Sequence, residues 1–215
     1  MKYYPVFLDL KGRKAVVVGG GRVAERKVLA LLKAGADITV ISPSITTRLL
    51  KERSKKTIRH IPRDFERNDL QGAFLVIAAT NSPEVNREVA VRSPALVNVV
   101  DVPSECNFIA PSVITRGYLT IAISTGGISP AFAKTVRREL EKICGTEVSG
   151  YLEFLRGMRA KALSEISHKG KKEYFLKSLA SEDILNTLRS KGLNEVKKTV
   201  LTRFYKVKGN SKETT

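Results

Sequence analysis

The sequence has few of the residues from which disulfides, metal centres and membrane spans are built. It contains no tryptophan, two cysteines and two histidines among 215 residues. Cys106 and Cys144 stand far apart and outside any CxxC spacing, which indicates unpaired thiols in a reducing compartment. The longest purely apolar run, residues 74–79, falls far short of the roughly 20 residues that span a bilayer, and no secretion signal follows Met1. We therefore expect a cytoplasmic protein with no membrane partner.

Histidine is too scarce and too scattered for a dedicated metal centre. No pair of His or Cys residues has the spacing of zinc ligands, so we predict no metal site. His60 stands beside the lysines and arginines of residues 51–59, and we expect its side chain to be exposed.

Acidic residues are also in short supply. The chain has 38 Lys and Arg against 21 Asp and Glu, a formal net charge of +17 at pH 7. Residues 151–215 hold 15 of the basic residues and 7 of the acidic ones, so the excess is concentrated toward the C-terminal end. Such a charge indicates an anionic partner. Nucleic acid is one candidate, but the absence of tryptophan and of any reader motif argues against it.

Apolar runs of β-rich composition alternate with helical patterns through the first 110 residues. This rhythm is typical of an α/β fold with a Rossmann-like, doubly wound parallel sheet, whose ligand lies beyond the carboxyl ends of the strands. One helix is expected from Ser44 to Arg53, and another begins at Pro83 after a capping Ser82. The expected strands are residues 14–18, 37–41, 57–61, 74–79 and 96–100.

Three consecutive glycines follow the first expected strand. Gly19-Gly20-Gly21-Arg22-Val23-Ala24 fits the pattern G-x-G-x-x-A between that strand and a helix. In this pattern the first glycine makes a tight turn, the second lets the backbone approach a pyrophosphate, and the small third residue permits close packing of helix on sheet. Free N–H groups at the start of the helix favour an anion. The sequence therefore predicts a dinucleotide-binding loop.

The acid that usually marks an NAD-binding protein is missing. An Asp or Glu at the end of the second strand normally holds the ribose 2′-hydroxyl, but here the strand ends Ile41-Ser42-Pro43. Asp37 begins this strand and so lies at the wrong end of it. Arg22 and Arg48 are candidates for contact with a 2′-phosphate. NAD and NADP both stay open at this point.

Polar residues follow the fourth and fifth expected strands, at the edge of the sheet where a cofactor would lie. Thr80 and Asn81 are placed to contact the cofactor, although capping of the next helix is an alternative. Asp101 is placed to accept a proton beside the nicotinamide, although an Asp that only stabilises a turn is equally common there. Asn98 lies within an apolar strand, where its amide needs hydrogen-bond partners, and the following loop could supply them.

A short segment and a helical end follow the expected sheet domain. Residues 119–124 predict one strand, and Ser129-Pro130 begins a helix that reaches about Ile143. This segment is too small to bury a core alone, so we expect it to need a partner surface, and a second copy in a symmetric homodimer would supply one.

Amphipathic helices make up the rest of the chain. The clearest span Ser181–Ser190, before Gly192, and Asn194 to about Lys206, whose apolar stripe is more typical of a core than of a membrane face. The predicted boundaries are 1–112 for the dinucleotide-binding domain, 113–146 for the dimerisation segment and 147–215 for an all-helical domain.

Six motifs between Tyr4 and about Leu140 stand in the order and spacing of one family. They are Tyr4-Pro5-Val6-Phe7-Leu8-Asp9-Leu10, Val18-Gly19-Gly20-Gly21-Arg22-Val23-Ala24-Glu25-Arg26-Lys27, Ala78-Ala79-Thr80-Asn81, Asn98-Val99-Val100-Asp101, Phe108-Ile109-Ala110-Pro111-Ser112 and Ser124-Thr125-Gly126-Gly127-Ile128-Ser129-Pro130. With these motifs the chain resembles the precorrin-2 dehydrogenase / sirohydrochlorin ferrochelatase family, the dehydrogenase module of siroheme synthase. The C-terminal part is similar to the family only in its helical character. The methyltransferase domain of some relatives is not expected, because the sequence ends at Thr215.

The resemblance implies an enzyme that oxidises precorrin-2 to sirohydrochlorin with NAD, in siroheme biosynthesis. Some members also insert ferrous iron, so Fe²⁺ is a candidate second substrate and not a resident cofactor. The motif match carries the family's catalytic aspartate onto Asp101, and Asn98, Pro111 and Ser112 are expected to line the substrate pocket. The cofactor contacts expected are Gly19, Gly21, Arg22, Val23, Ser42, Pro43, Ser44, Thr80 and Asn81. The helical domain is expected to close over the substrate.

One rival function and the net charge are considered beside this resemblance. A non-enzymatic NAD(H)-sensing module is the alternative function, but it would need the glycine loop and have no use for Asp101. The positive charge fits a tetrapyrrole that carries several carboxylates, together with the pyrophosphate of a dinucleotide. We expect the excess to gather at a cleft between the sheet domain and the helical domain, contributed by Arg116, Arg137, Arg138, Arg156 and Arg159.

Overall fold

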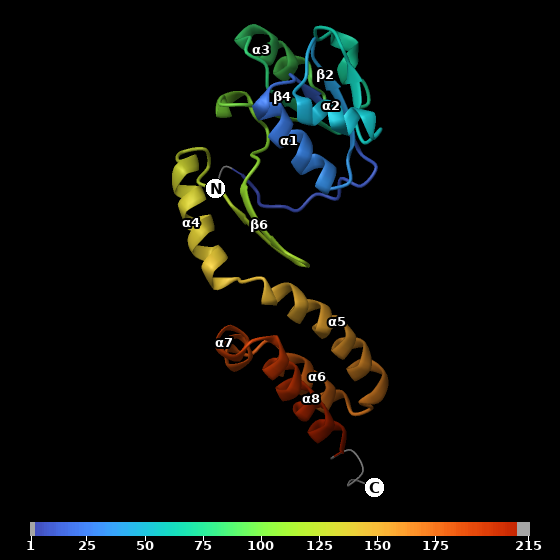
Figure 1. Ribbon diagram of the computed structural model, residues 1–215, viewed down its shortest axis with the longest axis vertical. Coiled ribbons are helices and arrows are strands. Elements are labelled where there is room, and N and C mark those ends of the chain that lie inside the picture. The colour runs from blue at the N-terminus through green and yellow to red at the C-terminus, as the bar shows by residue number, and fades with distance from the viewer. Residues whose placement is uncertain (1–2, 210–215) are drawn as a thin grey trace. The chain divides into compact units, whose positions relative to one another are not determined.

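The computed structural model describes residues 3–209, which divide into two compact units (Figure 1). The first unit comprises the residues up to Ala110 together with Gly126–Ile128, and the second comprises Pro111–Thr125 and the residues from Ser129 onward. Within residues 3–209, no helix combines the length and the apolar character that crossing a membrane requires.

The first unit is built on a parallel five-stranded sheet with the strand order β3-β2-β1-β4-β5. Parallel strands read as nearly continuous apolar runs because both faces of the sheet are covered, and all four residues of β4 are buried. The predicted parallel sheet is confirmed, and every strand lies within two residues of its expected ends. The strands are β1 (Lys14–Val18), β2 (Asp37–Ile41), β3 (Arg59–Ile61), β4 (Leu75–Ala78) and β5 (Leu96–Val99).

Helices cover both faces of this sheet. On one face α1 (Arg22–Lys33) and α2 (Thr47–Ser54) share a core with Val17, and on the other α3 (Pro83–Arg92) shares a core with Val16. The chain therefore winds outward from β1 in both directions, which places the switch point of the topology between β1 and β4. Two short 3-10 helices complete the unit: η1 (Arg67–Leu70) and η2 (Pro103–Glu105).

The connection between β2 and α2 corrects the expected start of a helix. The helix predicted from Ser44 begins at Thr47, and Thr46 caps it by accepting a hydrogen bond from the Leu49 N–H at 3.3 Å. Thr46 also donates its own N–H to the carbonyl oxygen of Gly20 at 3.1 Å. Residues 42–46 stay outside the helix because tertiary contacts fasten them to the glycine loop.

The second unit opens with a β-hairpin, of which the sequence predicted only one strand. β6 (Ser112–Arg116) pairs antiparallel with β7 (Leu119–Ile123), and Gly117, with φ +59°, supplies the tight turn between them. Ile114 is the one fully buried residue of β6, so this strand shows little of the apolar pattern that identifies strands from sequence. The predicted helix follows as α4 (Pro130–Ile143), capped by Ser129.

Four helices follow α4 and complete the described part of the second unit; Figure 1 labels each of them. Phe175 and Phe204 are fully buried at their centre and meet edge to face, with 5.4 Å between ring centroids. Val196, Val200 and Phe204 form the buried stripe of the last helix, so the apolar stripe expected there belongs to a core. The helices are α5 (Glu147–Glu165), α6 (Lys169–Ser178), α7 (Glu182–Lys191) and α8 (Leu193–Gly209).

Candidate functional site

The glycine loop joins β1 to α1 at the carboxyl edge of the sheet. Gly19 has φ +115°, and a Cβ there would lie 2.3 Å from the carbonyl oxygen of Ala79 at the end of β4. Around Gly21, in contrast, no other part of residues 3–209 comes within 4 Å of the position that a Cβ would take. Ala24 is fully buried between helix and sheet. This geometry suits a tight turn, an open approach for a ligand and close packing, the three roles of the pattern.

Gly20, the variable position of the pattern, is constrained as well, which the motif did not indicate. A Cβ on Gly20 would lie 2.0 Å from the carbonyl oxygen of Ser44. The hydroxyl of Thr46 donates a hydrogen bond to Glu25 of α1 at 2.5 Å. The segment after β2 is therefore fastened to both the loop and the helix that would hold a pyrophosphate.

A cavity of about 600 Å³ lies against this loop, at the switch point between β1 and β4. Its volume is in the range of about 300–1,000 Å³ typical of small-molecule sites. Of the predicted cofactor contacts, Arg22 and Val23 do not line it, and Arg22 is exposed at the start of α1. Those that do line it are Gly19, Gly21, Ser42, Pro43, Ser44, Thr80 and Asn81.

Sequence reasoning missed part of the cavity wall. Asp64 and Phe65, from the connection after β3, line the cavity together with Val85 and Glu88 of α3. The pairing of β3 with β2 would have indicated Asp64 and Phe65, because the carboxyl ends of the two strands meet at one edge of the sheet. Asp64 and Phe65 are far from the glycine loop in the sequence, so the sequence alone did not indicate that they lie beside it.

His60 corrects another expectation. The side chain expected to be exposed is half-buried in β3, with Nε2 2.9 Å from the carbonyl oxygen of Ser42. Its Nδ1 is buried and has no hydrogen-bond partner among the described residues. The run of basic neighbours misled the prediction because alternate residues of a strand point to opposite faces. His60 ties the end of β2 to β3.

Thr80 and Asn81 follow β4 at the edge of the cavity. Capping of α3 falls to Ser82, whose hydroxyl accepts the Val85 N–H at 3.2 Å. The Thr80 hydroxyl lies 2.8 Å from the side-chain oxygen of Asn86, a buried residue of α3. The β4–α3 connection is thus held in a defined shape beside the glycine loop.

Asp101 stands in the turn after β5. It has φ +63°, the left-handed region that Asp tolerates better than most residues, and its side chain is exposed. The thiol of Cys106 organises the turn: its sulfur accepts the Val99 N–H at 3.1 Å and lies 3.3 Å from the carbonyl oxygen of Val102. The predicted catalytic carboxylate is therefore presented on a supported turn, at the same edge of the sheet as the cavity, although it does not line the cavity.

Asn98 and Lys27 form a polar pair behind this turn. The buried Asn98 amide donates to the carbonyl oxygen of Phe108 at 3.2 Å and accepts from the Lys27 ammonium at 3.4 Å. Burial, and secondly the nearby Arg26, lower the pKa of Lys27, while Asp101 and Cys106 act in the opposite direction. Asn98 thus holds the following loop, which is the alternative left open by the sequence, and contact with substrate stays a prediction.

The remaining predicted residues belong to the second unit. Pro111 and Ser112 lead into β6, so a place beside the substrate stays a prediction for both. Of the arginines expected to line a cleft, Arg116 donates to the carbonyl oxygen of Cys144 at 3.0 Å and Arg137 pairs with Glu141 at 3.2 Å. The expected cationic cleft also stays a prediction.

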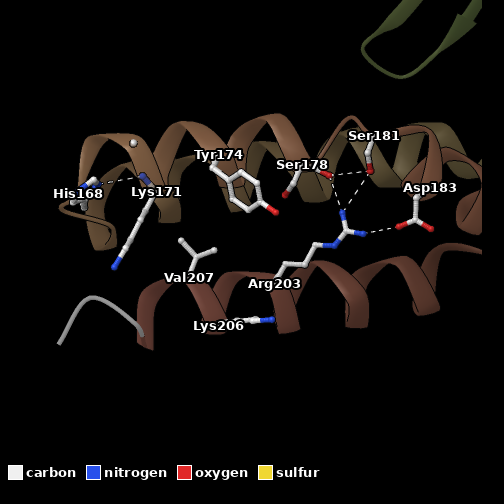
Figure 2. Close-up of a pocket in the computed structure, with 10 residues that line it drawn as sticks. His168, Lys171, Tyr174, Ser178, Ser181, Asp183, Arg203, Lys206 and Val207 are labelled. Atoms are coloured by element: carbon white, nitrogen blue, oxygen red, sulfur yellow. Dashed lines mark hydrogen bonds and ion pairs between the residues drawn. The ribbon is translucent and has the colours of Figure 1, made fainter. Parts of the chain in front are cut away.

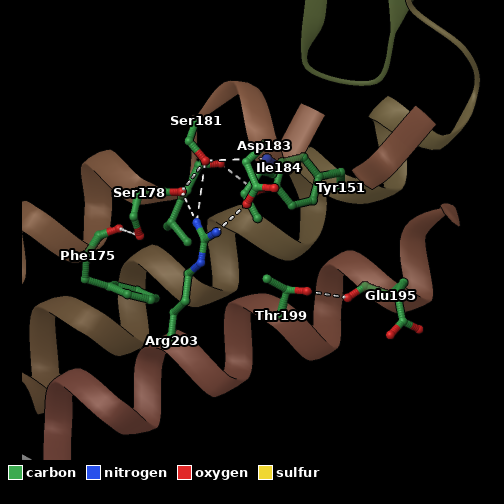
Figure 3. Close-up of polar contacts among 10 residues, drawn as sticks. Tyr151, Phe175, Ser178, Ser181, Asp183, Ile184, Glu195, Thr199 and Arg203 are labelled. Carbon is green, nitrogen blue, oxygen red and sulfur yellow. Dashed lines mark hydrogen bonds and ion pairs between the residues drawn. The ribbon is translucent and has the colours of Figure 1, made fainter. Parts of the chain in front are cut away.

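A larger cavity, of about 830 Å³, lies between α6 and α8 (Figure 2). His168, Lys171, Tyr174 and Lys206 contribute to its lining. Arg203, at one end, donates to the Ser178 carbonyl oxygen at 3.0 Å and to Asp183 at 2.5 Å (Figure 3). These contacts of Arg203 hold α8 against the connection between α6 and α7, so its role is structural. Despite its smaller size, the cavity at the glycine loop is the better candidate site, because it combines a helix N-terminus with the switch point of a parallel sheet.

No group of three or more His, Cys, Asp or Glu side chains is placed to hold a metal ion in the part of the chain that the structure describes.

Comparison with known families gives two matches along the chain. Residues 6–112 match a family model described as NAD(P)-binding, and residues 116–143 match one described as the central part of a sirohaem biosynthesis protein. The first match identifies the first unit as a binding domain for a nicotinamide dinucleotide.

Individual relatives agree with these matches. The siroheme synthase of Methylobacillus flagellatus is 45% identical over 66% of this chain and 31% of its own length. Siroheme synthase 1 of Aeromonas salmonicida is 37% identical over 89% of this chain and 42% of its own length, so the chain spans less than half of either relative. A solved structure of SirC, a precorrin-2 dehydrogenase, is 30% identical, covers 93% of this chain and all of its own, and superimposes with a TM-score of 0.79.

Proposed function

The chain belongs to the precorrin-2 dehydrogenase family, and we propose that it catalyses the NAD-dependent oxidation of precorrin-2 to sirohydrochlorin in siroheme biosynthesis. The observation that carries the proposal is Asp101, held at φ +63° on the carboxyl edge of a sheet whose glycine loop suits a dinucleotide. A likeness over the full length of SirC supports it.

The residues of the first unit suit a dinucleotide. The open space at Gly21 and the N–H groups at the start of α1 suit a pyrophosphate, and the cavity beside them has room for an adenosine. A bound nicotinamide supplies the hydride acceptor. The preference for NAD over NADP is part of this proposal.

Asp101 would act as the base. Oxidation of the macrocycle removes a hydride from one ring carbon and a proton from a neighbouring position, and the Asp101 carboxylate accepts that proton. Proton transfer by a positioned side chain contributes about 10²- to 10⁴-fold in rate. The hydrogen bonds of Cys106 hold the backbone of the turn that carries Asp101, which supports this role.

The test is anaerobic incubation with precorrin-2 and NAD, then NADP, with and without Fe²⁺, following the absorption of the pigment. We expect oxidation with NAD, and a fall of about 10²- to 10⁴-fold in Asp101→Asn with unchanged NAD binding. Asn suits the comparison because it also tolerates a left-handed turn. Dinucleotide binding without any oxidation would favour a regulatory NAD(H)-sensing module. The arms with Fe²⁺ decide whether iron is a second substrate.

A homodimer built on β6, β7 and α4 is also part of the proposal. In α4 only Ala133 is buried, and Phe132 is 62% exposed; on the hairpin, Tyr118 is 64% exposed. These uncovered apolar side chains support pairing with a second copy. We expect a dimer in sedimentation equilibrium, a monomer for Phe132→Glu, and a dimer for the control Leu163→Glu on the exposed side of α5. A monomeric wild-type protein would contradict the proposal.

A further inference from the structure

We infer that Asp64 makes this protein select NAD over NADP: its carboxylate accepts a hydrogen bond from the ribose 2′-hydroxyl and repels a 2′-phosphate. The inference rests on the proposed function, because it concerns the cofactor of the same site. It also answers the question raised by Ile41-Ser42-Pro43, where the second strand ends without the customary acid.

The topology brings Asp64 to the place of the missing acid. β3 pairs in parallel with β2 so that Ile41 lies opposite Ile61, and the Ser42 N–H donates to the carbonyl oxygen of Ile61 at 3.2 Å. The carboxyl ends of the two strands therefore coincide. Asp64 follows Ile61 by three residues and lines the same cavity as Ser42 and Pro43. An acid that is absent from the end of β2 in sequence is thus supplied in space from the end of β3.

The charge at this position is not already compensated. Among the described residues, the Asp64 carboxylate has no hydrogen bond or ion pair. Glu88, the other acid in the cavity wall, pairs with Arg92 at 2.8 Å and Arg67 at 3.5 Å. Asp64 is therefore the lining acid free to accept a hydrogen bond from the cofactor.

No lysine or arginine is found among the described residues that line this cavity. Of the two arginines considered for a 2′-phosphate, Arg48 pairs with Glu52 at 3.6 Å and Arg22 lies outside the cavity wall. Arg63, next to Asp64, forms a bidentate pair with Asp69 at 2.9 and 2.7 Å. A 2′-phosphate would therefore meet an uncompensated carboxylate and find no positive side chain in the wall.

The backbone around Asp64 is held in place. The Arg63 guanidinium donates to the carbonyl oxygen of Asp64 at 2.9 Å while it is fixed by Asp69. His60 ties the end of β2 to β3 through the carbonyl oxygen of Ser42. These contacts position the Asp64 backbone before the cofactor binds, which favours selectivity because little order has to be created on binding.

The experiment measures dissociation constants for NADH and NADPH, by their fluorescence, on the full chain and on Asp64→Asn. We expect the wild-type protein to prefer NADH. The variant should lose about tenfold or more of that preference, because it loses a hydrogen bond to a charged group and the repulsion of a 2′-phosphate. Asn keeps the shape of the side chain and removes its charge. Asp9→Asn is the matched control: it makes the same change in net charge at an exposed residue outside the cavity, and its preference should equal that of the wild type.

Several results would overturn the inference. They are an unchanged preference in Asp64→Asn, an equal loss of affinity for both dinucleotides (which would indicate a contact with the adenine), a wild-type protein that prefers NADPH, or one that binds neither. The readout is binding and not turnover. Selective binding of NADH through Asp64 in a protein that leaves precorrin-2 unchanged would refute the proposed reaction and leave this inference standing.

Discussion

A methyl group added at Gly20 should lower the stability of the fold, whereas one added at Gly21, the next residue, should weaken cofactor binding. At Gly20 a Cβ would lie 2.0 Å from the carbonyl oxygen of Ser44, a backbone atom that cannot give way without moving residues 42–46. Overpacking of this kind costs about 1–3 kcal/mol. For a unit of about 110 residues, each kcal/mol lowers the melting temperature by about 4 °C. We therefore expect Gly20→Ala to be clearly destabilised before any cofactor is considered.

At Gly21 the same substitution should leave the stability of the fold nearly unchanged and weaken the binding of NADH. The φ of −78° suits alanine, and no other atom of the described part of the chain lies within 4 Å of the new Cβ. The cost in stability should stay below about 1 kcal/mol, the ordinary penalty for alanine at a helix N-cap. The methyl group would instead occupy the approach of the pyrophosphate, and NADH affinity should fall by at least tenfold, about 1.4 kcal/mol.

Thermal melts by circular dichroism and NADH titrations by fluorescence measure both effects on the same samples. Unchanged NADH affinity in Gly21→Ala would refute the placement of the pyrophosphate at this loop. Wild-type stability in Gly20→Ala would show that residues 42–46 are not held against the glycine loop.

Further predictions concern stability. Tyr151→Phe removes a buried hydroxyl that donates to the Leu179 carbonyl oxygen at 2.6 Å. Because that oxygen is left unpaired, the free energy of unfolding measured in urea should fall by about 1–3 kcal/mol. Wild-type stability would contradict the buried hydrogen bond. Burial also raises the pKa of Tyr151 to about 12, so its phenolate should be absent from ultraviolet titrations of the folded protein at pH 10. The hydrogen bond from Arg63 lowers the pKa of Asp69, so this pair stabilises the fold fully above the ordinary Asp pKa of about 3.9 and loses its effect as pH falls through the lower folded value. Asp69→Asn should therefore be less stable at pH 7 and lose less stability on acidification below about pH 4; parallel curves for the two proteins would rule out this linkage.

Much of the first unit could be predicted because its signals are local. Runs such as residues 14–18 and 37–41 are strands as expected, since nearly continuous apolar character marks a strand buried on both faces. Ser82 and Pro83 mark the start of α3 for an equally local reason, the capping of free N–H groups. The prediction of a dinucleotide loop depended on the same kind of signal, three small residues between a strand and a helix.

The errors arose where contacts distant in sequence decide the outcome. The helix expected from Ser44 starts later because Thr46 bonds to the glycine loop. His60 is half-buried because β3 presents it toward the end of β2. β6 was overlooked because it buries little by itself and depends on its pairing with β7.

The sequence by itself determined the fold class, the glycine loop and the family, because each depends on short patterns whose physical meaning is local. Only the tertiary structure decided which residues share the cavity. Parallel pairing of β2 and β3 brings Asp64 beside Ser42, and no spacing rule along the chain expresses that proximity. An acid missing from the end of β2 is found instead in the connection after β3, because the carboxyl ends of parallel strands meet at one edge of the sheet.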